Sequence, residues 1–411
     1  MLLRPIIDVF WFLKETSLFS PLQLAGLLTF FFSAVFGFKL PSSKKGGIPI
    51  EFSLFSGLLL VNLFLISAEV WTAGSWIAFV RFSTPIALFI YLLKVMKNES
   101  RFLGFVYTFL ASSIFPLSML YYEAIFDPIT QVPLSESRGG GFRLTGLYAD
   151  LFNYMSYVIG DFFLLSYLFV RLLSKPKSKQ VGILKIAAVL LLAIVGLIGL
   201  KHQASWIVFL FILVSVVVNG FRHARVKQYL LVIGIPALLI TPVVILPTLE
   251  RLFSKELNAY SGEADSNRTL NGRFIRWERY FDLWVDIPLV PKLTGVSFSK
   301  LDEKKKMAMT GGGMHSDYVR FLFATGIIGL ISLLLFYFRV LLERKNFRKS
   351  EKFFITTSVG IMCLYGVTSN PFGSSGSLMF VLFSGMAISL NKAKLFYTEP
   401  ARPSNKQLNG G

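Results

Sequence analysis

The chain has 411 residues, of which 54% are hydrophobic, and its mean hydropathy is +0.61. Its 42 lysines and arginines against 23 acidic residues give a formal net charge of +19. The basic residues form short clusters between apolar runs, so we assign this charge to membrane topology and expect no nucleic-acid partner. A single cysteine, Cys363, excludes a disulfide framework, and no cluster has metal-ligand spacing, so no metal or cofactor is expected.

Several apolar runs approach the roughly 20 residues that an α-helix needs to cross about 30 Å of hydrocarbon. The sequence therefore predicts an all-α fold, a polytopic membrane helix bundle with about 11 transmembrane helices, within a range of about 10 to 12. Residues 1–20 remain open, either as an interfacial helix or as part of another crossing. The expected segments are 21–38, 52–68, 73–94, 102–121, 148–171, 182–200, 204–220, 228–247, 317–341, 353–369 and 373–391.

Basic clusters recur in alternate connections between these segments, as at Lys94 and Lys97 and from Arg344 to Lys352. Because lysine and arginine are enriched in cytoplasmic loops, we expect these connections in the cytoplasm. The Gly-rich loop near 122–147 and the large loop then face the periplasm or the cell exterior. The expected divisions are an N-terminal bundle of about eight helices, the large external loop, the C-terminal membrane helices and a cytoplasmic tail, at 1–247, 248–316, 317–391 and 392–411.

Polar residues interrupt the first part of the chain at three places. Arg81 lies inside the third apolar run, where a charged side chain is costly, so Arg81 is a candidate functional residue. Its long side chain could instead reach the membrane interface. The loop that begins at Ser137 brings Arg143 and Asn153 to the outer end of the fifth segment. Lys201 lies between the sixth and seventh segments and is a candidate for the same reason as Arg81.

The large loop contains an amphipathic helix, predicted from Asn271 as N-cap to Pro288 as its stop. Its expected apolar face consists of Phe274, Trp277, Phe281 and Trp284. Such a helix would lie on the bundle or on the lipid surface.

Three arginines, Arg273, Arg276 and Arg279, follow one another at intervals of three at the start of this helix. The helix macrodipole disfavours cations there, and like charges at this spacing repel each other. Arg279 has Asp282 three residues ahead, whereas Arg273 and Arg276 have no carboxylate three or four residues toward the C-terminus. One possibility is that these two arginines pair with acidic residues elsewhere or with lipid headgroups. The other is that they bind a phosphate group, whose geometry a guanidinium matches well.

His315, Ser316 and Asp317 stand at the entrance of the ninth segment, after three glycines. Ser316 or Asp317 would make an ordinary N-cap for a helix that begins near Tyr318. A lone histidine is usually structural, but His315 closes the same loop that holds the arginines, where an imidazole could position or deprotonate a hydroxyl.

Three stretches together resemble the bacterial O-antigen polymerase and O-antigen ligase family of membrane glycosyltransferases. The first runs from Arg143 to Gly146 with Asn153 downstream. The second is Gly272-Arg273 with Trp277, then Pro288 and Gly295-Val296. The third, which is the most specific, is His315-Ser-Asp317-Tyr-x-Arg320 leading into Gly326-Ile-Ile-Gly329. The resemblance covers roughly residues 140 to 345 and departs from the family at Lys201-His202-Gln203 and at Ser316.

The resemblance implies an inverting, metal-independent glycosyl transfer from sugars carried on undecaprenyl diphosphate. Arg273 and Arg276, with Arg143 and Lys201, would bind the diphosphate leaving group. His315 would orient or deprotonate the acceptor hydroxyl and Asp317 would steady His315. Arg81, Asn153 and Arg320 are further candidate residues.

These expectations lead to a polymerase of lipid-linked oligosaccharide repeat units in the bacterial inner membrane, with a cytoplasmic C-terminus. Ligation of finished glycan to a lipid or protein acceptor is the nearest alternative, since the donor would be the same. A flippase or transporter of the same glycans is an alternative from a different class, and it would place its charged residues at the bilayer midplane on broken helices. The implied partners are the lipid-linked oligosaccharide, an acceptor glycan or lipid, membrane lipids, a chain-length regulator and a flippase.

Overall fold

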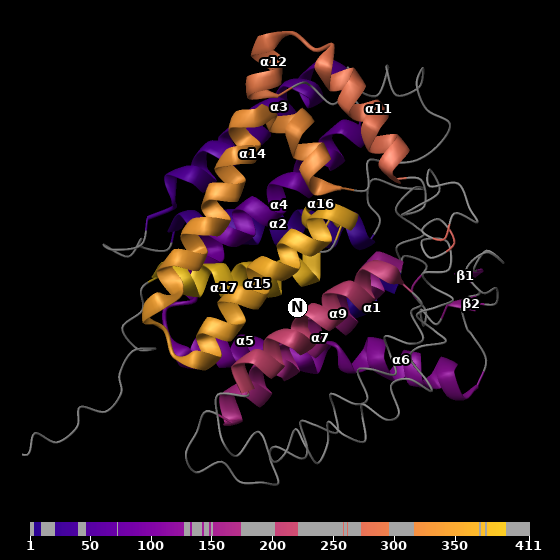
Figure 1. Ribbon diagram of the computed structural model, residues 1–411, viewed down its shortest axis with the longest axis vertical. Helices are drawn as coiled ribbons and strands as arrows, with labels where there is room; N and C mark the ends of the chain where they lie inside the picture. Colours follow the sequence, from indigo (N-terminus) through magenta and orange to yellow (C-terminus); the bar gives the residue numbers. More distant parts are fainter. Residues whose placement is uncertain are drawn as a thin grey trace, which may run out of the picture.

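The computed structural model describes residues 4–9, 21–39, 47–71, 73–126, 132–133, 142–143, 148, 151–173, 202–220, 258, 261, 273–295, 316–369, 371–374 and 376–391. In chain order, its elements are α1 (Arg4–Val9), α2 (Pro21–Lys39), α3 (Ile50–Val70), α4 (Ala73–Val95), α5 (Glu99–Ser112), α6 (Ile114–Ile125), β1 (Val132–Pro133), β2 (Phe142–Arg143), α7 (Leu151–Leu173), α9 (Gln203–Gly220), α11 (Arg273–Val285), α12 (Leu289–Thr294), α14 (Asp317–Glu343), a 3-10 turn (Arg344–Asn346), α15 (Lys349–Thr368), α16 (Pro371–Ser374) and α17 (Gly376–Asn391) (Figure 1).

The helical membrane fold is confirmed. By length and composition, five helical spans among the described residues could cross a membrane: Ile50–Glu69, Trp76–Val95, Glu99–Glu123, Tyr154–Leu173 and Asp317–Glu343. The third of these spans changes helix at Ser113, where α5 ends and α6 begins. Strands β1 and β2 form a two-residue antiparallel ladder in which Val132 pairs with Arg143. The expected segments 182–200 and 228–247 lie outside the described residues.

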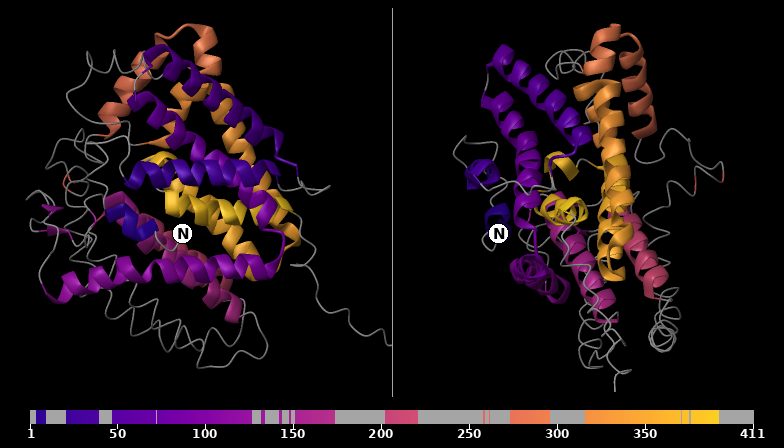
Figure 2. Two further views of the ribbon diagram at one scale, coloured as in Figure 1. Left: turned by 180° about the vertical axis from the view of Figure 1, so that it is seen from behind. Right: turned by 90° about the vertical axis from the view of Figure 1, so that its left-hand side faces the viewer.

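The helices pack in two connected groups. In one group, α4 contacts α2, α3 and α17, while α14 lies against α3 and α15. In the other, α7, α9 and α15 contact one another, and α17 touches both α4 and α15 (Figure 2). Helices α11 and α12 pack on α14, at the edge of the first group (Figure 1). Helix α14 therefore provides the main packing surface for the large-loop helices on the membrane bundle.

Phenylalanine rings fill the junction between α3, α4, α14 and α17. The ring centroid of Phe52 lies 4.3 Å from that of Phe89 and 4.9 Å from that of Phe336. Phe383 of α17 lies 5.2 Å from Phe89. Edge-to-face and tilted contacts of this kind add to the free energy gained from burying each ring. These rings therefore form part of the protein core.

Helix α14 corrects the expectation of one uninterrupted helix over 317–341. Gly326 has φ +66° and ψ −172°, which is not helical, so the element consists of a first arm (residues 317–325) and a second arm (residues 327–343). Essentially only glycine adopts this backbone region, because a Cβ would collide with the neighbouring peptide groups. The break is therefore specified by the glycine.

The two arms fold back toward the same stretch of α3. Phe55 contacts Phe321 of the first arm with ring centroids 5.0 Å apart, and Phe52, one turn earlier, contacts Phe336 of the second arm. In a straight helix, residues 321 and 336 would lie about 22 Å apart along the axis. The two arms accordingly appear as neighbouring ribbons in Figure 1.

A charged network ties α5, α7 and α15 together at one end of the bundle. Arg171 of α7 pairs with Glu99 and lies 3.6 Å from Glu351. It also donates a 3.0 Å hydrogen bond to the hydroxyl of Tyr167, which in turn donates to Glu351 at 3.3 Å. Glu351 is only 1% exposed, so its charge depends on these partners.

We expect Arg171→Met to destabilise the protein, because it leaves the Glu351 carboxylate buried without its cation. Removing one partner of a buried ion pair typically costs about 3–5 kcal/mol. The measurement is the apparent unfolding temperature in detergent. Arg339→Met is the control, because the Arg339–Glu51 pair (2.9 Å) is more exposed, at 42% and 23%, and should contribute about 1 kcal/mol or less. Equal shifts in the two variants would contradict a special role for Arg171.

Candidate functional site

The bundle has two distinct ends, and α15 connects them. Glu351, in the first turn of α15, belongs to the Arg171 network, and Ser369, just past its last turn, accepts a hydrogen bond from the backbone N–H of Asp317 at 3.2 Å. These 18 residues span about 27 Å. We refer to the two ends as the Glu99 end and the Asp317 end.

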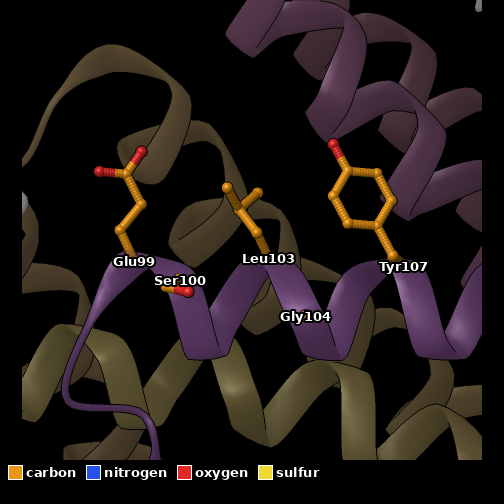
Figure 3. Close-up of a pocket in the computed structure, with 5 residues that line it drawn as sticks. All are labelled: Glu99, Ser100, Leu103, Gly104 and Tyr107. Atoms are coloured by element: carbon orange, nitrogen blue, oxygen red, sulfur yellow. The ribbon is translucent and has the colours of Figure 1, made fainter.

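A shallow, open cavity of about 610 Å³ lies at the Glu99 end (Figure 3). Its lining comes from one face of α5: Glu99, Ser100, Leu103, Gly104 and Tyr107. Glu99 is already engaged by Arg171 and lies 3.5 Å from Arg348. This cavity is remote from the predicted site residues, so the candidate site is built at the Asp317 end.

The first arm of α14 begins with a buried polar turn. Ser316 is the N-cap, as expected: its hydroxyl accepts from the backbone N–H of Val319 at 3.5 Å and donates to the carbonyl of Gly366 at 3.0 Å. Asp317 is 2% exposed, and its Oδ2 accepts a 2.9 Å hydrogen bond from the backbone N–H of Phe372. These bonds fix the start of α14 against the junction of α15 and α16.

Two arginines that the sequence marked as candidates flank this carboxylate. Arg320, one turn further on, and Arg81 of α4 are both close enough for their charges to act on Asp317. The guanidinium of Arg320 lies 5.1 Å from the ring centroid of Phe82, the residue after Arg81, in a cation–π arrangement. Arg81 is exposed and lies eight residues after the start of α4, about 12 Å along the helix. A charged residue within an apolar membrane segment is a candidate functional residue.

Helix α11 turns one face toward α14. Tyr280, 1% exposed, stacks edge-on against Phe323 of the first arm with ring centroids 5.9 Å apart. Trp277 and Trp284 pack around this contact, as do Leu283 and Ile287. The amphipathic helix is confirmed, but Phe281 is 48% exposed and does not belong to the packed face. Tyr280 lies in the packed face instead, because the face of α11 that contacts α14 is rotated by about one residue from the face that the sequence predicted.

Arg273 and Arg276 lie on the packed face of α11. They precede Tyr280 by seven and four residues, spacings that repeat on one side of a helix. Both are half-buried, whereas Arg279 is exposed. The two arginines that the sequence favoured for anion binding are therefore directed toward the bundle, unlike Arg279.

The arginine end of α11 lies level with the start of α14. The C-terminal end of α11 leads within three residues to α12, which packs at the break of α14 near Gly326. Its N-terminal end, with Arg273 and Arg276, extends away from the break along the first arm, whose own start is Asp317 (Figure 1). Helices α4, α11 and α14 thus each bring arginine to the Asp317 end.

Helix α12 and the break of α14 meet backbone to backbone. A Cβ at Gly295 (φ +106°) would lie 2.2 Å from the carbonyl oxygen of Ala324, and one at Gly326 would lie 2.3 Å from the carbonyl of Leu293. Both glycines were part of the predicted motifs. Their roles follow from this contact, since any side chain there would separate the two elements.

His202 forms a hydrogen-bonded chain at the same end of the bundle. Its Nδ1 lies 2.9 Å from Oγ of Ser205, and that oxygen lies 3.1 Å from the hydroxyl of Tyr365, one residue before Gly366. In the sequence, His202 was noted only as part of the departure from the family pattern at Lys201-His202-Gln203. The sequence feature that could have indicated this hydrogen-bonded chain was the polar triplet at the start of an apolar run.

The remaining predicted residues are placed only in part. Asn153 is in the first turn of α7, and because the last turn of α7 holds Arg171 at the Glu99 end, Asn153 lies toward the Asp317 end. Arg143 is in β2, and the structure describes its backbone pairing only. Lys201 and His315 lie outside the described residues, as does Asn271.

A comparison with protein-family models gives one match. Residues 188–334 match the model of the family described as O-Antigen ligase. This central region is similar to the O-antigen ligase family. A search of curated proteins and of solved structures gave no match. The O-antigen ligase family match and the apolar helices indicate an integral inner-membrane protein of the O-antigen ligase or polymerase type, a glycosyltransferase-like enzyme whose family implies a lipid-linked glycan substrate.

The match to the O-antigen ligase family contains much of the site described above. It spans α9, α11, α12 and the first arm of α14, with Arg273, Arg276, Asp317 and Arg320. Arg81 lies before the matched region, yet the fold brings it within electrostatic range of Asp317. The matched region and the N-terminal bundle therefore both contribute residues to the candidate site.

Proposed function

We propose that this protein is an O-antigen or exopolysaccharide polymerase. It joins oligosaccharide repeat units carried on undecaprenyl diphosphate at the outer face of the inner membrane. The observation that supports this proposal is that Arg81 and Arg320 lie within electrostatic range of Asp317, while the arginine end of α11 lies level with the start of α14 (Figure 1), largely within the matched region. A diphosphate needs several positive charges, and guanidinium groups bind phosphate oxygens in pairs.

The proposed reaction is an inverting transfer. The acceptor sugar hydroxyl attacks the anomeric carbon of the donor, and a new carbon–oxygen bond forms as the bond to the diphosphate oxygen breaks. The hydroxyl proton passes to a base, and undecaprenyl diphosphate leaves with the bonding electron pair. Arg273 and Arg276 stabilise the negative charge that grows on the leaving group. In this proposal the arginines supply the positive charge, so the transfer is metal-independent.

His315 is the proposed base, and Asp317 is the proposed residue that holds it. Asp317 is too buried to touch a substrate, and Oδ2 is already occupied by the N–H of Phe372. Its Oδ1 accepts no hydrogen bond from the described residues and can serve the imidazole that precedes it by two residues. Arg143, Asn153 and Lys201 are proposed as further substrate contacts on the evidence of their sequence positions.

The proposed topology follows the charge pattern. The large loop faces the periplasm and the C-terminus the cytoplasm. The Asp317 end is then external, where the lipid diphosphate itself supplies the energy of the transfer. A flippase that delivers the donor and a chain-length regulator are the proposed partners.

Ligation is the second candidate function, because the matching family is described as O-Antigen ligase. A ligase would use the same donor site and the same arginines. It differs only in its acceptor, which would be a finished lipid or protein instead of a second repeat unit.

A gel of surface and lipid-linked glycans distinguishes the two. In a strain that lacks this chain, we expect glycan that stops at a single repeat on its final acceptor, with the ladder restored by a plasmid copy. Long chains stranded on the carrier lipid would instead identify a ligase. Normal glycan in both fractions would contradict both functions.

A further inference from the structure

Asn62 is a polar residue within the apolar run of α3, and it contacts two distant parts of the chain. Its Nδ2 donates a 2.9 Å hydrogen bond to the carbonyl of Thr294, the last residue of α12. The same nitrogen donates a 2.8 Å hydrogen bond to the carbonyl of Ala324 in the first arm of α14. One side-chain amide therefore joins a membrane helix to the large loop and to the broken helix.

Both carbonyls need a partner from outside their own helix. The carbonyl of Ala324 would bond to the N–H of Ile328 in a continuous helix, but the break at Gly326 interrupts that pattern. Thr294 ends a six-residue helix, and the last four carbonyls of any helix lack intrahelical partners. In an apolar environment, an unsatisfied carbonyl is costly. The two N–H groups of the Asn62 amide donate the hydrogen bonds that these two carbonyls would otherwise lack.

The amide of Asn62 is closely packed against the backbone at Gly295. A Cβ at Gly295 would lie 2.7 Å from Nδ2 of Asn62, in addition to its collision with Ala324. The amide thus lies where the two backbones meet. Asn62 is eight residues from the end of α3, and Arg81 eight residues from the start of α4, so the two residues lie at similar depth in consecutive helices.

We propose that Asn62 is a positioning residue that latches α12 to the break of α14 and thereby places the arginine helix α11. Because α12 follows α11 after only three residues, fixing α12 fixes the C-terminal end of α11, and the Tyr280–Phe323 contact fixes its face. Arg273 and Arg276 are then held against the start of α14. This inference rests on the proposed function, since it assigns those arginines a ligand.

The latch is tested first without reference to activity, by hydrogen–deuterium exchange on the full chain in lipid nanodiscs. Asn62→Leu removes both donors at similar volume, and Asn62→Asp is a second variant that keeps the size and polarity. We expect amide exchange in 289–295 and 320–328 to rise by about tenfold or more, because two carbonyls lose their partner. Unchanged exchange in both segments would overturn the latch.

Asn391→Leu is the matched control. The amide of Asn391 also joins two elements, donating at 2.9 Å to the carbonyl of Met96, but it lies beyond the other end of α4. We expect this variant to leave exchange at 289–295 unchanged. Equal exchange in Asn391→Leu and Asn62→Leu would mean general loosening and would also overturn the latch.

Kinetics with the lipid-diphosphate donor separate positioning from loss of folded protein. In Asn62→Leu, we expect the donor KM to rise about tenfold, because displaced arginines bind the diphosphate less well. A mere loss of folded enzyme would lower only the apparent kcat and would overturn the positioning role. If exchange rises while Arg276→Ala keeps full activity, the latch stands and the proposed function fails.

Discussion

Replacement of Arg276 by alanine is expected to lower transfer from a lipid-diphosphate donor by about 100-fold or more, with normal insertion into the membrane. The reason is that Arg276 lies half-buried on the α14-facing side of α11, where its charge would stabilise the departing diphosphate. Loss of one such contact in an active site typically costs about 100- to 1,000-fold in rate. We expect the same direction for Arg273→Ala. The measurement is the initial rate of glycan transfer, normalised to the amount of purified protein.

Arg279 provides the matched control on the same helix. It is exposed at the edge of the packed face of α11, so Arg279→Ala should retain activity within about two- or threefold. Arg276→Lys should recover only part of the rate, because an ammonium group does not reproduce the paired contacts of a guanidinium. Normal rates in both Arg273→Ala and Arg276→Ala would remove the basis of the proposed function.

Gly326→Ala is expected to have the largest effect on folding. The backbone at this position, φ +66° and ψ −172°, is almost exclusive to glycine, and a Cβ would lie 2.3 Å from the carbonyl of Leu293. The strain and the overlap together should cost about 3 kcal/mol or more. The measurement is the fraction of monodisperse protein after detergent extraction, together with its apparent unfolding temperature.

Gly57→Ala is the control for this substitution. Gly57 lies in α3, and a Cβ there would meet no atom within 4 Å. Alanine favours a helix interior by about 1 kcal/mol over glycine, so this variant should be at least as stable as the parent. If Gly326→Ala were equally stable, the break of α14 would not depend on the glycine.

Apolar length predicted most of the membrane helices, whereas tertiary contacts decided where they break. The run around Gly326 is apolar on both sides, and a single glycine inside such a run is compatible with a straight helix. Its positive φ follows from contact with Leu293, which is 33 residues away in the sequence and cannot be seen in a local pattern. The change from α5 to α6 at Ser113 was missed in the same way.

The face of α11 shows how closely periodicity can predict a surface. The spacing allowed either Phe281 or Tyr280 beside Trp277 and Trp284, since both fit a helical repeat. Only the contact with Phe323 selects Tyr280. The aromatic face was therefore predictable as a feature, but its central residue was not.

The sequence could propose single candidate residues, but it could not show how they are arranged in space. Arg81 and Arg276 were chosen from local chemistry and Asp317 through the family resemblance, and their relative positions depend on how α4, α11 and α14 pack. Asn62 was missed, although an asparagine inside an apolar run is a signal of an intramembrane hydrogen bond. The hydrogen bonds of His202 were missed because attention went to the charge of the neighbouring Lys201.

The broken helix needs comparison with the transporter alternative, because transporters often build their binding sites on such breaks. There, unwound backbone groups bind the substrate or ions. Here, the carbonyl of Ala324 at the break is occupied by Asn62, and α12 packs directly against Gly326. The break therefore serves as an attachment point for the large loop, which favours a transferase.

The most direct test uses the purified full chain in lipid vesicles, with an undecaprenyl-diphosphate-linked oligosaccharide as donor and a second copy of it as acceptor. Released undecaprenyl diphosphate and new glycosidic bonds are measured together. We predict that both appear in equal amounts and that both are lost in Arg276→Ala. Donor that crosses the bilayer with its glycan still attached, without release of undecaprenyl diphosphate, would contradict the account and identify a transporter.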